Sequence, residues 1–282
     1  MNTSTHPPAD LSVSIVLHNS SLALLNAALQ SLRRAAQCAH DAGDLARLTV
    51  WLVDNASDER YRATLKAELA HWPSSECFEV QCLPQPRNRG FGCGHNAVLS
   101  QLTSDFHLVL NPDVELQEDI LQVGLASMRQ GEDSVLLSPK VVGGQGEQEF
   151  LCKRYPSVLV LLLRGFAPAA LRRLFRRRLE RYEMRDVCSG ETPVDVAIAS
   201  GCFMLVRTAA LRAVGGFNED FFLYFEDFDL SLRLAEKGRL VFEPRMHIVH
   251  HGGYAANKGR AHVKYFIRSG IRFFNRHGWR LI

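Results

Sequence analysis

The sequence predicts an α/β domain with a mostly parallel central sheet flanked by helices, and three observations lead to that prediction. Short apolar runs alternate with stretches of helical spacing between residues 13 and 110. Polar residues follow directly after these runs, at the strand ends where open parallel sheets bind ligands. The chain has 282 residues, 46% of them hydrophobic, which is enough for a large core.

The first half of the chain shows the alternation clearly. Strands are expected at 13–17, 48–53, 78–83 and 106–110, where the residues are almost all apolar. Helices are expected at 22–32, 59–69 and 90–102, and Ser20 or Ser21 should cap the first of them. Strands that alternate with helices in this way are typical of a largely parallel sheet.

The second half is less regular. A Gly-rich hairpin tip is expected at 143–148, a basic helical insertion at about 153–187, and a strand pair or one broken strand at 194–206. A helix should begin at the acidic residues near 226, run to about Lys237 and end at Gly238. Short strands at 240–242 and 247–249 and an amphipathic helix at 263–274 follow.

Composition excludes several classes of protein. The net charge of +3 is too small to indicate a nucleic-acid partner. The seven cysteines include no Cys-x-x-Cys pair, which favours reduced thiols in a cytosolic protein. The first ten residues are polar, and the apolar run at 158–163 is far shorter than the roughly 20 residues that span a bilayer. We therefore expect a cytoplasmic location and no integral membrane segment.

An acidic cluster at 221–230 is the most informative local feature. It places Glu226, Asp227 and Asp229 directly behind an aromatic run, and burial of this kind raises a carboxylate's pKa and makes it a better base. Glu226 and Asp229 share one helix face and Asp227 does not, so one carboxylate can reach a substrate while the others hold the helix end. The alternative is an N-cap cluster on a solvated helix. A second carboxylate just past an apolar run, Asp113, favours the functional interpretation.

Polar features also follow the predicted strands at their ends. His18, Asp54, the loop at 88–94 and Asp113 should meet at one edge of the sheet, which predicts a ligand site there. Two alternatives remain. Asp54 could cap the following helix. The loop, whose Gly-Phe-Gly-Cys-Gly pattern does not fit a dinucleotide fingerprint, could simply pack helix against strand.

Eight motifs, taken together, resemble family 2 glycosyltransferases of the GT-A fold, most closely their rhamnosyltransferase-like branch. They lie at 14–20, 53–57, 88–92, 110–113, 200–207, 215–217, 222–227 and 249–253. Each is moderately specific, whereas their order and spacing are highly specific, and the likeness covers roughly 11–280. It implies a Rossmann-like nucleotide-diphospho-sugar transferase fold as a single domain over 11–282. Residues 11–115 would bind the nucleotide-sugar and 116–282 the acceptor.

The resemblance also implies roles for individual residues. Asp227 would be the catalytic base, and Gly201 and Glu226 would lie on the acceptor side. Asp113 and His250, or less favourably His251, would hold a divalent cation, Mg²⁺ or Mn²⁺. The donor would be bound by His18, Asn19, Asp54, Asn55, Asn88, Gly90, Phe91, Asn96, Asn111 and Asp113.

Two departures from the family pattern bear on the site. His18 stands where a tyrosine is usual, and its imidazole can still stack on a nucleotide base. Asn111 replaces the first acid of the Asp-x-Asp metal motif, which leaves one carboxylate, Asp113, for the cation.

The activity that the resemblance implies is inverting, non-processive transfer of one sugar to a saccharide acceptor. Rhamnose from dTDP-rhamnose is the expected donor, and a lipid-linked acceptor in cell-surface polysaccharide or O-antigen synthesis is expected. The Gln-x-x-Arg-Trp motif of processive synthases is absent. A sugar nucleotidyltransferase would carry a Gly-rich, Arg-containing loop where residues 18–21 stand. A non-catalytic nucleotide-sugar or glycan-binding module is the remaining alternative, and it would be expected to lose Asp113 and Asp227.

An arginine-rich segment at 164–185 holds eight arginines against Glu180 and Glu183. It could be a solvated helix face. Alternatively it could contact an anionic membrane as a peripheral protein on the inner face of the cytoplasmic membrane, or bind the diphosphate of a lipid-linked acceptor.

Overall fold

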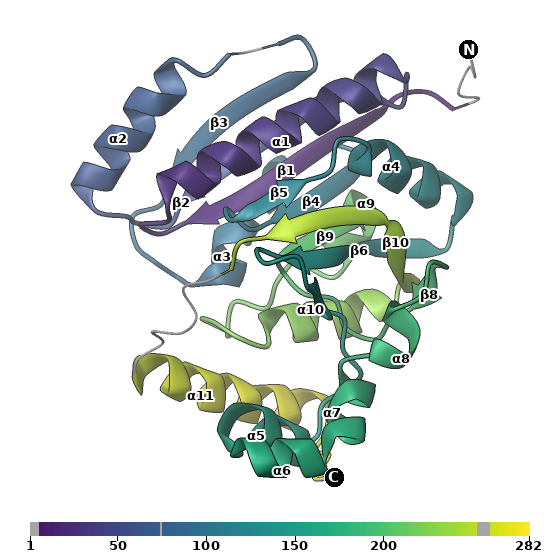
Figure 1. Ribbon diagram of the computed structural model, residues 1–282. Helices are drawn as coiled ribbons and strands as arrows, with labels where there is room; N and C mark the ends of the chain where they lie inside the picture. The colour runs from purple at the N-terminus through teal and green to yellow at the C-terminus, as the bar shows by residue number, and fades with distance from the viewer. Residues whose placement is uncertain (1–5, 74, 253–259) are drawn as a thin grey trace.

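The computed structural model describes residues 6–73, 75–252 and 260–282 (Figure 1). Gly253, in the last matching motif, lies outside the described residues. The strands are β1 (Ala9–Leu17), β2 (Leu45–Asp54), β3 (Phe78–Pro84), β4 (Phe106–Leu110), β5 (Val114–Leu116), β6 (Ser134–Gly143), β7 (Gln148–Glu149), β8 (Val194–Asp195), β9 (Phe203–Arg207) and β10 (Arg239–His250). Among the described residues they form one ten-stranded sheet, in the order β3-β2-β1-β4-β9-β6-β10-β5, with β7 beside β6 and β8 beside β10.

The helices cover both faces of this sheet. They are α1 (Leu22–Asp41), α2 (Glu59–Ala70), α3 (Phe91–Asn96), the 3₁₀ turn η1 (Leu99–Gln101), α4 (Ile120–Gln130), α5 (Val158–Phe166), α6 (Ala169–Leu174), α7 (Arg176–Tyr182), α8 (Arg185–Cys188), α9 (Thr208–Ala213), α10 (Glu226–Ala235) and α11 (Arg260–His277). Apolar residues of α1 and α4 pack in one core cluster, and those of α9 and α10 in another, on the opposite face. Alternate residues of β1 and β2 feed the two clusters, as the two-residue period of a strand requires.

The mostly parallel sheet is confirmed, with a specific exception. β3, β2, β1 and β4 are parallel neighbours, and β6 and β10 are parallel to each other. β9 is antiparallel to both β4 and β6, so it lies between two groups of strands that run in the same direction. β5 is antiparallel to β10 at the far edge.

Most expected elements of the first half are present, and Ser21 caps α1 by accepting a hydrogen bond from the Leu24 backbone N–H at 3.4 Å. The helix expected at 90–102 is split into α3 and η1. Three glycines within the first five residues of that stretch lower its helix propensity, which is consistent with so short a helix. The hairpin tip at 143–148 is confirmed, because β6 and β7 pair antiparallel across it.

Four expectations in the second half needed correction. β10 is one strand rather than two, with a register shift between Glu243 and His247 where a break was expected. β8 and β9 do not pair with each other, since β8 pairs with β10. α10 ends at Ala235, and Gly238 is no helix cap; a Cβ there would lie 2.3 Å from the Asp133 carbonyl oxygen, so glycine allows a close approach of two chain segments. No element was assigned to 116–142, which forms α4 and most of β6.

The basic insertion is helical, as expected, and consists of α5, α6, α7 and α8. In Figure 1, α5, α6, α7 and α11 gather with the C-terminus at one end of the molecule, away from α1 and α2. A third apolar cluster joins α11 to the acidic motif through Phe221, Phe225, Phe273 and Phe274. Within the described residues, none of the helices has the length and apolar character needed to cross a membrane.

Candidate active site

The ends of β1 and β2 form one side of the site. Leu17 lies beside Asp54 in the parallel register, so the loops that follow the two strands are neighbours. Asn19 joins these loops: its backbone N–H donates to Ser57 Oγ at 2.9 Å, and its side-chain oxygen accepts from the Asp58 N–H at 3.0 Å. His18 is exposed beside this junction. The structure therefore brings His18, Asn19 and Asp54 together, with the Asn19 side chain holding the loop.

Asp54 is not the cap of the next helix, because Asp58 is the N-cap of α2. Asp54 is 1% exposed, and its Oδ1 accepts a hydrogen bond from the Ser57 N–H at 3.0 Å. Its Oδ2 is buried with no hydrogen-bond partner, although Arg62 Nε approaches to 3.4 Å. Burial, reinforced by the Asp54 charge, raises the pKa of Tyr61 to about 12. A buried carboxylate oxygen without a partner is costly and is suited to accept a hydrogen bond from a ligand.

The loop at 88–94 is fixed by asparagine side chains. Asn55 Nδ2 donates to Asn88 Oδ1 at 3.0 Å and to the Gly90 carbonyl at 2.9 Å. Gly90 has φ +94°, and a Cβ on it would lie 2.1 Å from the Phe222 carbonyl oxygen, which accepts a hydrogen bond from the Phe91 N–H at 3.0 Å. The loop therefore packs directly on the aromatic run before the acidic cluster. The loop therefore has a packing role, and its contact with Phe222 also positions Phe91.

Asn96 lies at the end of α3 and is fully engaged by the protein. Its side-chain oxygen accepts from the Phe217 N–H and its amide donates to the Phe217 carbonyl, both at 2.8 Å. It ties α3 to the turn at Gly215-Gly216-Phe217. The structure thus places Asn55 and Asn96 as supports of the loop, behind the residues that line the site.

Asp227 lies in the first turn of α10, where Gly201 and Phe91 approach it. Its Oδ2 accepts a hydrogen bond from the Gly201 N–H at 3.1 Å, and its Oδ1 accepts from the Phe228 N–H at 3.0 Å. A Cβ on Gly201 would lie 3.0 Å from the Phe91 ring and 3.5 Å from the Asp227 Cβ. Gly201 therefore lets the chain pass closely between the ring and the carboxylate.

The backbone before α10 is unusual. Tyr224 and Phe225 both have positive φ, 70° and 66°, a conformation that costs about 1–2 kcal/mol for a residue with a side chain. The Phe225 ring packs against Phe228, Phe266 and Phe273 at centroid distances of 5.3, 5.1 and 5.4 Å. These contacts with α11 hold the strained residues in place, and such strain often lies at functional sites.

The neighbouring carboxylates Glu226 and Asp227 differ in their partners. Burial raises the pKa of both, and for Glu226 the nearby Asp227 charge raises it further, well above its usual value. Glu226 Oε2 is buried without a hydrogen-bond partner, whereas both oxygens of Asp227 accept backbone N–H bonds. Hydrogen bonds to the charged form favour ionisation. Ionisation is therefore more favourable for Asp227 than for Glu226, and Asp227 is the member of the pair better suited to act as a base.

Asp229 has a structural role. It is 0% exposed, and its carboxylate contacts Arg233, Arg276 and His277 at 2.7, 3.2 and 2.8 Å. Arg276 and His277 belong to α11, so Asp229 fastens α10 to α11. This agrees with the expectation that part of the acidic cluster holds the helix, and contact of another carboxylate with a substrate stays a prediction.

Asp113 and His250 meet where β5 pairs with the end of β10, since Val114 lies opposite His250. His250 Nε2 is 3.7 Å from Asp113 Oδ1, which is buried and has no hydrogen-bond partner. His250 Nδ1 is 3.1 Å from Glu149 Oε2. His251, next along the strand, contacts Glu115 at 2.7 Å instead. Adjacent strand residues point to opposite faces, so only His250 can serve the same site as Asp113.

This arrangement fits two ligands of a divalent cation. Within the described residues, no group of three or more His, Cys, Asp or Glu side chains is arranged to hold a metal. A buried carboxylate oxygen without a partner, facing an imidazole nitrogen, is nevertheless a pair of acceptors that a cation would satisfy. A pocket of about 430 Å³ opens beside Asp113, lined also by Asn19, Ser21 and Pro112.

The two acidic sites are parts of one region, joined by Cys202 at the start of the β9 segment. The Asn111 N–H donates to the Cys202 carbonyl at 2.9 Å. Burial chiefly, with the charges of Asp113 and Asp227, raises the pKa of the Cys202 thiol to about 12. Cys202 thus lies between the strand end that carries Asp113 and the segment whose Gly201 N–H donates to Asp227.

With this geometry established, comparison with known proteins identifies the family. The model of glycosyl transferase family 2 matches residues 12–215, and that of glycosyl transferase family group 2 matches residues 167–279. The chain belongs to glycosyl transferase family 2. It is therefore a glycosyltransferase, and the resemblance noted in its motifs is confirmed.

Two relatives are rhamnosyltransferases. N-acetylglucosaminyl-diphospho-decaprenol L-rhamnosyltransferase of Mycobacterium tuberculosis is 29% identical over 249 residues, which cover 82% of this chain and 76% of the relative. Rhamnosyltransferase WbbL of Escherichia coli is 25% identical over 240 residues, 79% of this chain and 85% of the relative.

Solved structures confirm the GT-A fold. GalNAc-T7, crystallised with UDP, GalNAc and Mn²⁺, matches 95% of this glycosyltransferase with a TM-score of 0.64 and 14% identity. The mannosyltransferase PcManGT of Pyrobaculum calidifontis, in complex with GDP-Man and Mn²⁺, matches 96% with a TM-score of 0.62 and 16% identity. This chain spans 48% and 64% of the lengths of those two proteins.

Sequence reasoning missed three side chains of the glycosyltransferase site. Glu149 contacts His250. Lys153 pairs through its backbone with Ile198, which shortly precedes the Gly201 that donates to Asp227, and Tyr182 packs beside Lys153. Lys153 is buried, which lowers its pKa to about 8, and its charge in turn lowers the pKa of Asp227. Its ammonium also lies 5.9 Å from the centre of the Tyr182 ring. No motif marked these residues, which belong to β7, to the segment between β7 and α5, and to α7.

Proposed function

We propose that this glycosyltransferase is an inverting, non-processive enzyme that transfers one rhamnose from dTDP-rhamnose to a lipid-linked saccharide during cell-surface polysaccharide synthesis. The observation that carries the proposal is Asp227, a partly exposed carboxylate with a raised pKa in the same region as Asp113. The two rhamnosyltransferases to which the chain is similar support the choice of sugar. One of them is named for a diphospho-decaprenol substrate, which supports a lipid-linked acceptor.

Asp227 would act as the base. Its carboxylate takes the proton of an acceptor hydroxyl as that oxygen attacks the anomeric carbon, and the bond from that carbon to the diphosphate oxygen breaks. Backbone N–H groups of Gly201 and Phe228 fix the carboxylate, and burial makes it a stronger base. Protonated Glu226 beside it avoids a second negative charge.

A divalent cation, Mg²⁺ or Mn²⁺, would be held by Asp113 and His250. Both structural neighbours were crystallised with Mn²⁺. A bound cation would offset negative charge on the diphosphate. Glu149 would keep the His250 ring oriented, so that Nε2 faces Asp113.

The two halves of the chain would bind the two substrates. Residues 11–115 would bind the donor, with His18, Asp54 and Phe91 at the nucleotide–sugar side. Residues 116–282 would bind the acceptor, with Gly201 and Glu226 near its hydroxyl. We also propose a cytoplasmic enzyme that works peripherally on the inner face of the cytoplasmic membrane, where a lipid-linked acceptor would be available.

The donor is tested by calorimetric titration with dTDP-rhamnose, UDP-glucose, UDP-galactose, UDP-N-acetylglucosamine and GDP-mannose, with and without Mg²⁺ or Mn²⁺. Cation-assisted binding of dTDP-rhamnose is expected. Preferential binding of another donor would replace rhamnose in the proposal. Binding of none would favour a non-catalytic module.

The base is tested by Asp227→Asn, which keeps the shape of the side chain and removes its basicity. Turnover should fall by about 10²–10⁴-fold while donor affinity stays unchanged, because a general base contributes a factor of this size. Asp220→Asn, an exposed residue a few positions earlier, makes the same chemical change and serves as control. Near-normal turnover of Asp227→Asn would show that another group takes the proton.

A further inference from the structure

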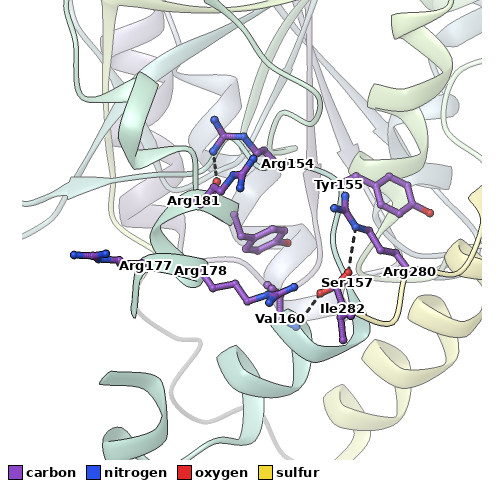
Figure 2. Close-up of a pocket in the computed structure, with 10 residues that line it drawn as sticks. Arg154, Tyr155, Ser157, Val160, Arg177, Arg178, Arg181, Arg280 and Ile282 are labelled. Carbon is purple, nitrogen blue, oxygen red and sulfur yellow. Dashed lines mark hydrogen bonds between the residues drawn. The ribbon is translucent and has the colours of Figure 1, made fainter. Parts of the chain in front are cut away.

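A cationic pocket of about 440 Å³ lies at the end of the molecule formed by α5, α7 and the C-terminal residues (Figure 2). Five arginines line it: Arg154, Arg177, Arg178, Arg181 and Arg280. Among the described residues, no Asp or Glu side chain lines it. Arg154 is paired with Asp186 at 2.8 Å, whereas Arg177 and Arg178 have no described Asp or Glu within ion-pair distance, and Arg280 Nε donates to the Ile282 main-chain oxygen at 3.3 Å. In Figure 2, Arg178 and Arg280 reach into the pocket from two sides, while Arg177 extends away from it.

A buried phenol adds a hydrogen-bond donor to these charges. Tyr182 lines the pocket, is 4% exposed, and has a hydroxyl that is buried without a hydrogen-bond partner. An unsatisfied buried donor is costly, and an anion bound in the pocket would satisfy it. Clustered arginines with a free donor are the chemistry that recognises phosphate groups, because the guanidinium fork matches phosphate oxygens.

The same phenol connects the pocket with the proposed catalytic base. Burial raises the pKa of Tyr182, and the negative charge of Asp227 raises it further. Lys153, whose ammonium lies over the Tyr182 ring, lowers the pKa of Asp227. Backbone pairing also links the two: the Arg154 N–H donates to the Tyr182 carbonyl and the Lys153 N–H donates to the Ile198 carbonyl, both at 2.9 Å, and Gly201, shortly after Ile198, donates to Asp227. The wall of the pocket and the segment that holds Asp227 are therefore neighbours.

Exposed apolar side chains lie on two of the elements that form the pocket, α5 and the C-terminal segment, and on α6 beside them. Leu162 and Phe166 of α5, Leu174 of α6, and Leu281 and Ile282 of the C-terminal segment are all more than half exposed, Leu174 by 76% and Ile282 by 73%. The C-terminal segment is held against α5, because the Val158 and Leu159 N–H groups donate to the Arg280 and Leu281 carbonyls at 2.8 and 3.0 Å. Arginines and a tyrosine hydroxyl inside the pocket, with apolar side chains on the neighbouring surface, suit an anion that carries an apolar chain.

We propose that this pocket binds the diphosphate of a lipid-linked acceptor, with the apolar chain of the lipid lying over α5, α6 and the C-terminal segment. The inference rests on the proposed function and identifies where its acceptor binds. Arg178, Arg280 and the Tyr182 hydroxyl bind the phosphate oxygens. The sugar attached to the diphosphate then extends toward Asp227. An anionic bilayer offers phosphates too, but its headgroups carry no sugar that would need a site next to the base.

The experiment compares two double variants that remove the same amount of charge. Arg178→Ala/Arg280→Ala alters the pocket, and Arg172→Ala/Arg173→Ala removes two exposed arginines of α6 that do not line it. Binding is measured by co-sedimentation with three kinds of phosphatidylcholine vesicle: neutral, containing phosphatidylglycerol, or containing undecaprenyl diphosphate. Inorganic pyrophosphate serves as competitor.

Wild-type protein should bind the undecaprenyl diphosphate vesicles best, and pyrophosphate should weaken this binding. The pocket variant should lose about tenfold in affinity for each arginine, since a charge-assisted hydrogen bond contributes about that factor. The α6 variant should bind as wild type does. Tyr182→Phe, which removes one oxygen only, should bind more weakly than wild type. Equal losses in both double variants, or equal binding to phosphatidylglycerol vesicles, would overturn the proposal in favour of general attraction to an anionic surface.

Failure of this inference can be distinguished from failure of the proposed function. Rhamnose transfer by the wild type is measured with a lipid-diphosphate acceptor and with a simple glycoside that has no diphosphate. If neither acceptor is used, the proposed function fails, while vesicle binding still tests the pocket. If the lipid acceptor is used equally well by the wild type and by the Arg178→Ala/Arg280→Ala variant, the function stands and the pocket proposal fails.

Discussion

Glu226 and Asp227 show how two adjacent carboxylates acquire different properties from their partners alone. Glu226 is buried and Asp227 is partly exposed, and only Asp227 accepts backbone hydrogen bonds on both oxygens. Negative charge is therefore favoured on Asp227, the residue that faces Gly201 and Phe91. The neighbouring third acid, Asp229, is committed to Arg233 and α11.

Glu149 gives a prediction at the same scale. Its carboxylate accepts from His250 Nδ1, which leaves the Nε2 lone pair directed at Asp113. Removing such an outer partner typically weakens metal affinity by about 10–100-fold. Glu149→Ala should therefore raise the Mg²⁺ or Mn²⁺ concentration that gives half-maximal donor binding by about that factor, with saturating cation restoring the signal.

Glu147→Ala is the matched control, because it removes the same charge from the same hairpin without contact to His250. Its half-maximal cation concentration should equal that of the wild type. If Glu149→Ala behaves likewise, His250 does not depend on Glu149 for its orientation, or His250 is not a ligand.

The sequence could indicate the acids of the site but not their partners. Asp113 and Asp227 follow recognisable local patterns, a strand end and an aromatic run. Glu149 and Lys153 follow none, because their roles depend on contacts with residues distant in the chain, such as His250. Asn55 lies within a matching motif and Asn96 follows one, yet whether they face the donor or the protein depends on hydrogen bonds with Gly90 and Phe217 that only the fold creates.

At the scale of elements, the loop before α3 and the loop before α10 act as one unit. Gly90 has φ +94° and approaches the Phe222 carbonyl so closely that a Cβ would lie 2.1 Å from it. Gly90→Ala should therefore destabilise the protein both by backbone strain, about 1–2 kcal/mol, and by pushing the two loops apart. Denaturant unfolding should show a larger loss than strain alone, and donor affinity should fall as well.

Gly43→Ala separates the two contributions. Gly43 also has positive φ, +78°, but a Cβ there meets nothing within 4 Å. Gly43→Ala should lower the free energy of unfolding only by the backbone strain, and it should leave donor affinity unchanged. Equal free energies of unfolding for the two variants would show that contact between the loops adds nothing to stability.

The elements that sequence reasoning located best are those with a continuous local signal. β1 to β4 are short, largely apolar runs followed by polar residues, although β3 at the sheet edge is only partly buried, and the sequence predicts all four to within a few residues. β6 carries Pro139 and Lys140 in its middle, which disguise it as a loop. The position of β9 between β4 and β6 has no local signal, because it depends on pairing between segments far apart in the sequence.

At the scale of the whole molecule, a buried polar chain makes stability depend on pH. His107 is 1% exposed; its Nδ1 is 2.7 Å from Ser12 Oγ and its Nε2 is 2.8 Å from Ser14 Oγ, which also contacts His95 Nδ1 at 2.7 Å. Burial lowers the pKa of His107 to about 3 and that of His95 well below its usual value. Both are neutral in the folded protein.

The sign of the effect follows from linkage. Below the unfolded value of about 6.5 the unfolded chain takes up a proton on His107 that the folded protein does not, so stability falls as pH falls. The wild type should lose about 1.4 kcal/mol per pH unit from this group between about pH 6 and pH 4. The destabilisation caused by His107→Gln should shrink at that rate over the same range.

The raised pKa of Glu226 changes stability with pH in the opposite direction. Because Glu226 is present in both the wild type and the His107→Gln variant, its contribution cancels in the difference between their free energies of unfolding. His71→Gln, at an exposed position after α2, provides the comparison. A destabilisation by His107→Gln that stays constant with pH would show that the imidazole is protonated in the folded state.

The pairing of β5 with the end of β10 has a consequence for biosynthesis. β1 to β4 can form from consecutive segments, but Asp113 and His250 become neighbours only when the last strand of the sheet docks beside one made much earlier. Contacts between such distant segments form late, because closing a long loop costs entropy. A nascent chain would thus acquire the strands around Asp54 while it still lacks a complete cation site. Sugar transfer would begin only after nearly the whole chain has been made. A partly synthesised chain would therefore not consume activated sugar.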